Sequence, residues 1–186
     1  MAGRGVALFD TAIGRCGIAW AERGLLSVWL PERDDRAIRA RMTDAFPALT
    51  EVAPPSAVAG WIAAIVALLR GEASDLSGVP LDMDGVPAFH RRVYEVTRTI
   101  PAGATTSYGE IAARLGEPGA AQAVGQALGH NPFPIVVACH RVLAAGGKLG
   151  GFSARGGAVT KLRMLSIESP HRIGALSLFD DVDLFG

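Results

Sequence analysis

A cysteine and a histidine stand side by side at Cys139 and His140, directly after the apolar run of residues 131–138. The thiolate form of cysteine is the nucleophile, and its ordinary pKa of about 8.5 means that activity at neutral pH needs a neighbouring base or cation. The run predicts a strand that delivers the two side chains to a turn. Because neighbouring side chains of a strand point to opposite faces, the dipeptide alone does not distinguish a reactive pair from a buried structural cysteine.

The other cysteine of the chain, Cys16, lies in the strand-like run of residues 16–20. Residues 1–17 show no long apolar run behind a basic stretch, so we expect no signal peptide. We therefore expect a cytoplasmic protein, in which a disulfide between Cys16 and Cys139 is not expected. The longest apolar stretch, residues 58–69, is too short to cross a bilayer. No cysteine–histidine set has metal-ligand spacing, so we predict neither a metal nor another cofactor.

Residues 1–86 predict an α/β domain with a small antiparallel sheet. Its first 30 residues alternate between apolar and polar side chains in short runs separated by turn signals, which indicates a meander with one buried face. Apolar residues four apart indicate an amphipathic helix after the meander, and a proline-containing linker precedes a second helix. The expected strands are residues 6–9, 16–20, 25–30 and 76–86, and the expected helices are residues 34–46 and 57–69.

Residues 87–172 predict a mainly α-helical, winged-helix-like domain. One helix is expected to open with a capping box, in which Ser107 accepts from the amide of Glu110 and the Glu110 carboxylate reaches back to the amide of Ser107. Two short helices around a four-residue turn with glycine are typical of a helix-turn-helix, and also of an ordinary helical hairpin. The expected helices are residues 88–98, 107–115 and 120–129.

The second helix of this pair has an unusual composition. Val124 and Leu128 are its bulky apolar residues, and most of the others are alanine or glycine. Small side chains let a helix backbone approach a partner closely. Such a helix fits a DNA groove about 6 Å wide, which excludes bulky residues.

Charge is balanced over the whole chain, with 18 basic and 18 acidic residues, but it is unevenly distributed. Residues 1–87 carry 8 basic and 11 acidic side chains, residues 88–172 carry 10 and 4, and the tail of residues 173–186 adds three aspartates. The total argues against a protein that coats nucleic acid or membranes through bulk charge. The middle block is nevertheless a candidate surface for a polyanion, or else an ordinary solvated face.

Residues 105–168, from TTSYGEIAARLG through NPFPIVVACHRV to KLRMLSIE, resemble the DNA-binding and active-site domain of the O6-alkylguanine-DNA alkyltransferases, or methylated-DNA–protein-cysteine methyltransferases. The resemblance is strong over residues 87–169, and residues 1–86 match the family's N-terminal α/β domain in outline. It implies a monomeric DNA-repair enzyme of single turnover. Its partner would be double-stranded DNA that contains alkylated guanine, from which the alkyl group passes irreversibly to cysteine.

Four residues would carry the reaction if the resemblance holds. Cys139 would attack the alkyl carbon on guanine O6, and His140 would take the thiol proton through a bridging water. Glu168 would orient His140, following the logic of a catalytic triad. Asn131 matches the family's hinge asparagine, which holds the turn before the active-site segment through hydrogen bonds to the backbone.

Other residues would contact the substrate, because chemistry on O6 requires the guanine to leave the base stack. Tyr108 matches the tyrosine that helps rotate the 3′ phosphate and contacts the flipped base, and the backbone amide of Ser153 would face O6. The carbonyls near Cys139 and Val142 would accept from the guanine amino group. Arg141 is expected to anchor the active-site turn rather than to contact a base.

Two positions depart from the family pattern. Gln122 stands where the family usually has the arginine that fills the space left by the flipped base, and Ala138 stands where proline usually precedes the nucleophile. Alanine restores an amide donor and frees the backbone. We therefore expect weaker base flipping or an altered lesion preference, with transfer retained.

Three alternatives remain open from the sequence. An alkyltransferase-like protein would bind lesions without transfer, but such proteins usually replace the cysteine that Cys139 matches. A transcription regulator would need base-reading side chains on its recognition helix, where Gln122 and Gln126 are the candidates. A cysteine hydrolase would need an oxyanion hole, which nothing in the sequence marks.

Overall fold

The computed structural model describes residues 3–169, so the acidic tail predicted for residues 173–186 lies outside the described residues. The chain forms two compact units. Among the described residues, unit 1 contains residues 3–85 together with Pro132–Val136, and unit 2 contains Val86–Asn131 and residues 137–169. The predicted division into folding domains at residue 86 stays a prediction. No helix within residues 3–169 combines the length and the hydropathy that a membrane crossing needs.

Unit 1 contains the predicted antiparallel meander. Strands β1 (Gly5–Thr11), β2 (Gly14–Ala21) and β3 (Gly24–Trp29) form one sheet in that order. The registers Val6↔Ala19 and Ile18↔Val28 align apolar residues across the sheet. The prediction of a small antiparallel sheet is therefore confirmed.

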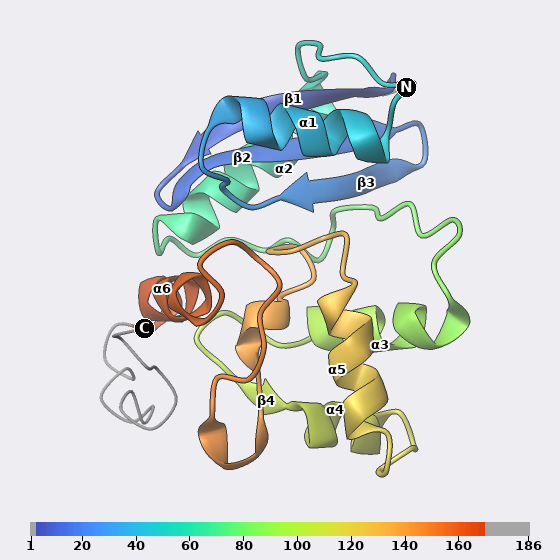
Figure 1. Ribbon diagram of the computed structural model, residues 1–186, viewed down its shortest axis with the longest axis vertical. Coiled ribbons are helices and arrows are strands. Elements are labelled where there is room, and N and C mark those ends of the chain that lie inside the picture. Colours follow the sequence, from blue (N-terminus) through green and yellow to red (C-terminus); the bar gives the residue numbers. More distant parts are fainter. Residues whose placement is uncertain (1–2, 170–186) are drawn as a thin grey trace. The chain divides into compact units, whose positions relative to one another are not determined.

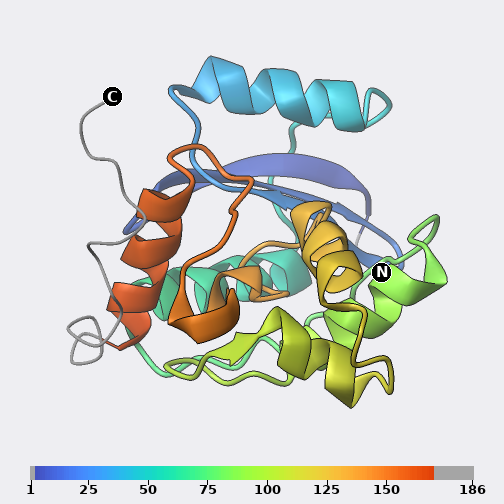
Figure 2. The same cartoon turned by 60° about the horizontal axis from the view of Figure 1, so that its bottom comes forward.

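Helices α1 (Asp35–Ala45) and α2 (Ser56–Leu69) lie on opposite faces of this sheet (Figure 1, Figure 2). The α1 helix begins at a cap in which the Asp34 carboxylate accepts from the amide of Ala37 at 2.8 Å. Its apolar stripe, Ile38 and Met42, is buried against the sheet together with Trp29. This helix is the amphipathic one that the four-residue spacing predicts.

The strand predicted for residues 76–86 is wrong. A turn at Leu76–Val79, closed by a hydrogen bond of 3.1 Å, comes first, and Pro80 has no amide hydrogen to donate to a ladder. What remains is a single parallel bridge between Leu81 and Leu25.

Unit 2 is mainly helical. Helix α3 (Ala88–Arg98) is followed by the two-residue strand β4 (Thr106–Ser107), helix α4 (Tyr108–Arg114) and helix α5 (Ala121–Gly129). After the 3₁₀ turn η1 (Cys139–Arg141), strand β5 (Val142–Leu143) pairs in parallel with β4. The 3₁₀ turn η2 (Ala145–Gly147) and helix α6 (Ala158–Glu168) follow (Figure 1).

The helix pair α4–α5 follows the predicted capping and turn signals. Ser107 Oγ accepts from the amide of Glu110 at 3.1 Å, and Glu110 Oε2 accepts from the amide of Ser107 at 2.8 Å, so the capping box is confirmed. At its other end α4 closes with the amide of Glu117 donating to Ala112 at 3.0 Å, across Gly116 with a φ of 77°. This is the left-handed helix end that glycine favours.

We predict that Gly116→Ala lowers the free energy of unfolding by about 1 kcal/mol, since a side chain is strained at this left-handed φ. An added Cβ would meet no atom within 4 Å, so the backbone conformation alone carries the cost. Urea denaturation measures the difference. The matched control is Gly119→Ala in the same turn, where the space is also open and φ is not positive. Equal effects of the two substitutions would contradict the prediction.

Candidate active site

The nucleophile candidate lies on a 3₁₀ turn, and the strand predicted for residues 131–138 is wrong. Pro132 and Pro134 cannot donate to a ladder, and Ile135 adopts a left-handed φ of 75° that no strand accommodates. The turn Cys139–Arg141 is closed by the amide of Arg141, which donates to Ala138 at 3.0 Å. The rule that neighbouring side chains oppose each other therefore does not apply to Cys139 and His140.

Asn131 fixes the backbone that leads into this turn. Its Nδ2 donates to the carbonyl of Val137 at 2.9 Å, and the same carbonyl accepts the amide of Cys139 at 2.8 Å. The side chain of Asn131 also hydrogen-bonds the thiol of Cys139. Asn131, which the sequence analysis predicted as a hinge, thus contacts both the backbone before Cys139 and the thiol of Cys139.

Helix α6 turns one face toward the Cys139–Arg141 turn. Lys161, Met164, Leu165 and Glu168 are spaced three or four residues apart and so share this face, and the first three are buried. The spacing brings Glu168, at the end of the helix, to the turn that carries the nucleophile.

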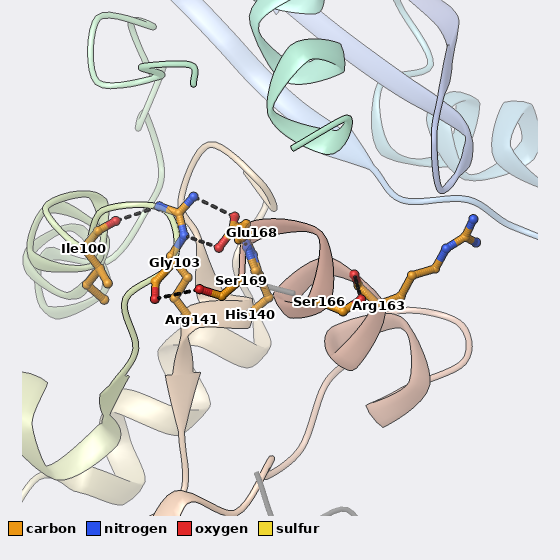
Figure 3. A network of polar contacts seen from close by, with 8 residues as sticks. All are labelled: Ile100, Gly103, His140, Arg141, Arg163, Ser166, Glu168 and Ser169. Carbon is orange, nitrogen blue, oxygen red and sulfur yellow. Dashed lines mark hydrogen bonds and ion pairs between the residues drawn. The ribbon is translucent and has the colours of Figure 1, made fainter. Parts of the chain in front are cut away.

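Glu168 joins the two residues that follow Cys139, His140 and Arg141, in one network (Figure 3). Its Oε1 lies 2.8 Å from Nε2 of His140 and 2.7 Å from Nη2 of Arg141, and its Oε2 accepts from Nε of Arg141 at 2.9 Å. Arg141 Nη1 donates to the carbonyl of Ile100 at 2.6 Å. The side chains of His140, Arg141 and Glu168 are 1%, 9% and 4% exposed, so the network is shielded from water.

The surroundings of His140 favour the neutral form of its imidazole. Burial lowers its pKa, the carboxylate of Glu168 raises it, and the charges of Arg141 and Lys161 lower it further, with a net shift downward. Because a carboxylate only accepts hydrogen bonds, the ring hydrogen lies on Nε2. The other nitrogen, Nδ1, is buried and has no hydrogen-bond partner within residues 3–169, so its lone pair is available for a proton.

Cys139 is half-buried, and burial raises the pKa of its thiol, although the Asn131 hydrogen bond and the charge of Lys161 counter this effect. The thiol therefore requires a base before it can react. Cys16, in contrast, is fully buried in unit 1, and desolvation raises its pKa to about 12. Both cysteines are free.

Lys161 is a functional candidate that the sequence analysis missed. Its fully buried ammonium donates to the carbonyls of Val142 and Leu149, each at 2.6 Å, and lies 5.9 Å from the ring centres of Tyr108 and Phe152. Burial lowers its pKa to about 8, and the Cys139 charge opposes that shift. The sequence could have indicated this residue, because Lys161 lies seven residues before Glu168 and therefore on the same helix face as Met164 and Leu165.

A pocket of about 810 Å³ opens beside Cys139. This volume lies within the range of about 300–1,000 Å³ that small-molecule sites occupy. Its walls come from the start of α4, from α5, and from the loops on either side of η2, and most of the lining residues are small. The lining includes Ser107, Tyr108, Ala121, Gln122, Gly125, Gln126, Cys139, Ala144, Gly151, Phe152 and Ser153.

The structure brings together four of the residues that the sequence analysis singled out, because Cys139, Tyr108, Gln122 and Ser153 all line this pocket. His140, Glu168 and Arg141 form the buried network described above. The Arg141 guanidinium is directed at Glu168 and Ile100, as an anchor of the turn would be. The carbonyl of Val142 already accepts one hydrogen bond, from Lys161. No three metal-ligating side chains lie close enough to hold a metal ion in the described part of the chain.

This geometry defines a class of protein in which a free, half-buried cysteine directly precedes a buried histidine beside a pocket against a helix-turn-helix. The family model described as "6-O-methylguanine DNA methyltransferase, DNA binding domain" matches residues 88–170. A methylated-DNA–protein-cysteine methyltransferase from Mycolicibacterium paratuberculosis is 48% identical over 126 residues, covering 68% of this chain and 74% of that protein. The chain belongs to the family of methylated-DNA–protein-cysteine methyltransferases.

More distant relatives agree with this assignment. The bifunctional transcriptional activator/DNA repair enzyme Ada of Escherichia coli is 34% identical over 163 residues, which are 88% of this chain and 45% of Ada. The crystal structure of Mycobacterium tuberculosis OGT in complex with DNA matches with a TM-score of 0.72 at 37% identity, covering 89% of this chain and 92% of that one. The predicted fold class, an α/β part followed by a helix-turn-helix part, is that of this family.

We predict that Glu168→Gln destabilises the protein at neutral pH and that this deficit shrinks as the pH falls below 4.5. Burial opposes ionisation of Glu168, but the hydrogen bonds from His140 and Arg141 outweigh it and lower its pKa to about 2, below the ordinary value of 4.5. The stabilisation is therefore present above pH 4.5 and is lost as the pH falls toward 2. Breaking a buried pair costs about 3 kcal/mol, measurable by urea denaturation between pH 7 and pH 3.

The control for this experiment is Glu117→Gln, which removes an Arg–Glu pair whose side chains are both 46% exposed. Exposed pairs contribute about 1 kcal/mol at most. A deficit of Glu168→Gln that stayed constant over the whole pH range would contradict the assignment of an ionised, paired Glu168.

Proposed function

We propose that this protein repairs DNA by transferring the alkyl group of O6-alkylguanine irreversibly to Cys139. The observation that carries the proposal is the position of Cys139 in the pocket wall, directly before a buried, neutral His140 that is hydrogen-bonded to Glu168. These residues lie within the segment that matches the family's DNA-binding domain.

The arrangement supports an in-line displacement. Nδ1 of His140 takes the thiol proton through a bridging water, and Glu168, which accepts from Nε2, stabilises the imidazolium that forms. The thiolate then attacks the alkyl carbon, so that a sulfur–carbon bond forms while the carbon–O6 bond breaks and its electron pair stays on O6. The product is a thioether, which has no easy leaving group, and each protein molecule therefore reacts once.

Lys161 is the counter-charge for the thiolate in this proposal. It carries no carboxylate partner among the described residues, and its charge lowers the pKa of Cys139 while Cys139 raises that of Lys161. A cation in a water-poor site stabilises a nearby anion far more than it would in water.

The partner we propose is double-stranded DNA that contains alkylated guanine. Most of the pocket lining is small or apolar, which suits a flat base extruded from the stack, and Tyr108 and Gln122 lie at its wall. Ser153 would face O6 through its amide, and the carbonyls of Cys139 and Val142 would accept from the guanine amino group. The excess of basic residues in 88–172 supports phosphate contact, and a protein that acts on DNA in this way would be cytoplasmic.

Intact mass spectrometry after incubation with duplexes that contain O6-methylguanine or O6-benzylguanine tests the proposal. We expect a gain of one alkyl group per molecule, which peptide mapping assigns to Cys139. Cys139→Ala should bind the duplex without gaining mass. The matched control is Cys16→Ala, which removes the buried thiol of unit 1 and should keep the full gain. Binding to the lesion without any mass gain in the intact protein would instead support the alkyltransferase-like alternative.

We further predict that Lys161→Met slows the reaction of Cys139 with iodoacetamide at pH 7 by about tenfold, because losing a neighbouring cation raises a thiol pKa by one unit or more. Peptide mapping restricts the measurement to Cys139, and circular dichroism checks the fold. The matched control is Lys148→Met, which removes the other, exposed lysine of the chain. Equal rates in the two variants would contradict the counter-charge role.

A further inference from the structure

The carboxylate of Glu168 is shared between two donors, and the larger share belongs to Arg141. Arg141 contacts both oxygens, with Nε on Oε2 at 2.9 Å and Nη2 on Oε1 at 2.7 Å, whereas His140 contacts Oε1 alone at 2.8 Å. Two parallel N–H···O bonds from one guanidinium to one carboxylate are a strong and geometrically specific pairing. The charge of Glu168 is therefore neutralised chiefly by Arg141.

This pairing matters because a histidine beside an unpaired, buried carboxylate tends to hold its proton. A buried opposite charge favours the charged form of its neighbour. An imidazolium cannot accept a proton from Cys139. An unpaired carboxylate beside His140 would therefore remove the base that the proposed reaction needs. A guanidinium that neutralises the carboxylate removes most of this pull and adds its own repulsion toward an imidazolium.

Within the described part of the chain, few charged or titratable groups face His140. Glu168 and Lys161 come from α6, and Arg141 and Cys139 adjoin His140 on its own turn. With both cations present, a protonated His140 would give the buried cluster a second uncompensated positive charge beside that of Lys161. The cluster is therefore built for a neutral imidazole.

We propose that Arg141 is a positioning residue that keeps His140 a neutral base by taking up the charge of Glu168. This role rests on the proposed function of His140 and goes beyond anchoring the turn. The hydrogen bond of 2.6 Å from Nη1 to the carbonyl of Ile100 holds the guanidinium in the plane that both carboxylate oxygens require. Lysine could not replace it, since an ammonium is a point charge without the planar fork.

The test follows the protonation of His140 directly, by nuclear magnetic resonance of ring-labelled histidine between pH 5 and pH 9. The His140 signal is assigned by its loss in His140→Gln. In the wild type we expect the ring to titrate below the ordinary histidine pKa, and in Arg141→Gln we expect the titration to move up by about one pH unit or more. The double variant Arg141→Gln/Glu168→Gln should return the titration toward the wild-type position, because the unpaired carboxylate is gone.

Arg92→Gln is the matched control. Arg92 also contacts one carboxylate, that of Glu117 at 2.7 Å, and one backbone carbonyl, that of Leu115 at 2.7 Å, but its pair is exposed. The Arg92→Gln variant should therefore leave the His140 titration unchanged. If Arg141→Gln does not fold, Arg141→Lys takes its place and should shift the titration in the same direction by a smaller amount.

An unshifted His140 titration in a folded Arg141 variant overturns the inference. The rate of alkyl transfer to Cys139, measured over the same pH range, separates this result from a failure of the proposed function. Transfer in the wild type without a shifted titration in the variant refutes the role of Arg141 alone. A shifted titration without transfer by the wild type refutes the proposed function alone, and a loss of rate in Arg141→Gln that recovers at higher pH supports both.

Discussion

The carboxylate of Glu168, buried against the turn Cys139–Arg141, is the interaction on which the rest of the site depends. A buried carboxylate is tolerated only where a partner of opposite charge and hydrogen bonds satisfy it. Glu168 meets this condition through the guanidinium of Arg141 and the neutral ring of His140, at 2.7–2.9 Å. The contact fixes the end of α6 on the nucleophile turn, although some 27 residues separate them in sequence. By fixing α6, it also fixes Lys161, two turns earlier on the same helix face.

The pocket depends on short, local pieces of backbone that this anchor holds together. The parallel pair β4–β5 places the start of α4, with Tyr108, beside the residues that follow Cys139. Lys161 donates to carbonyls at both ends of the segment from Val142 to Leu149, so one buried ammonium holds a strand and a loop of the pocket wall. A site assembled this way is ordered before a substrate arrives, which is what positioning a reacting group requires.

Local rules allowed much of this fold to be predicted from sequence. The capping box of Ser107 and Glu110, the apolar spacing of α1 and the alternation of the meander each depend on neighbours a few residues apart, and each prediction is confirmed. The strand at residues 131–138 failed because apolar composition does not reveal the left-handed Ile135 or the missing amides of two prolines. Lys161 was missed because lysine is ordinarily exposed, and only the contacts of a folded α6 explain its burial.

Counting the buried charges shows which group opposes the effect of burial, which raises the pKa of the Cys139 thiol. Arg141 and Glu168 cancel, so the ammonium of Lys161 is the excess charge when the thiol is protonated. In the proposed reaction the thiol proton passes to His140, so the thiolate gives that ammonium a counter-charge while the imidazolium keeps the total charge of the cluster unchanged. The same count shows what transfer changes, since a thioether is neutral and returns Lys161 to its uncompensated state. In the proposed reaction, no group among the described residues of the cluster would restore the thiolate once the alkyl group has been received, in keeping with a single turnover.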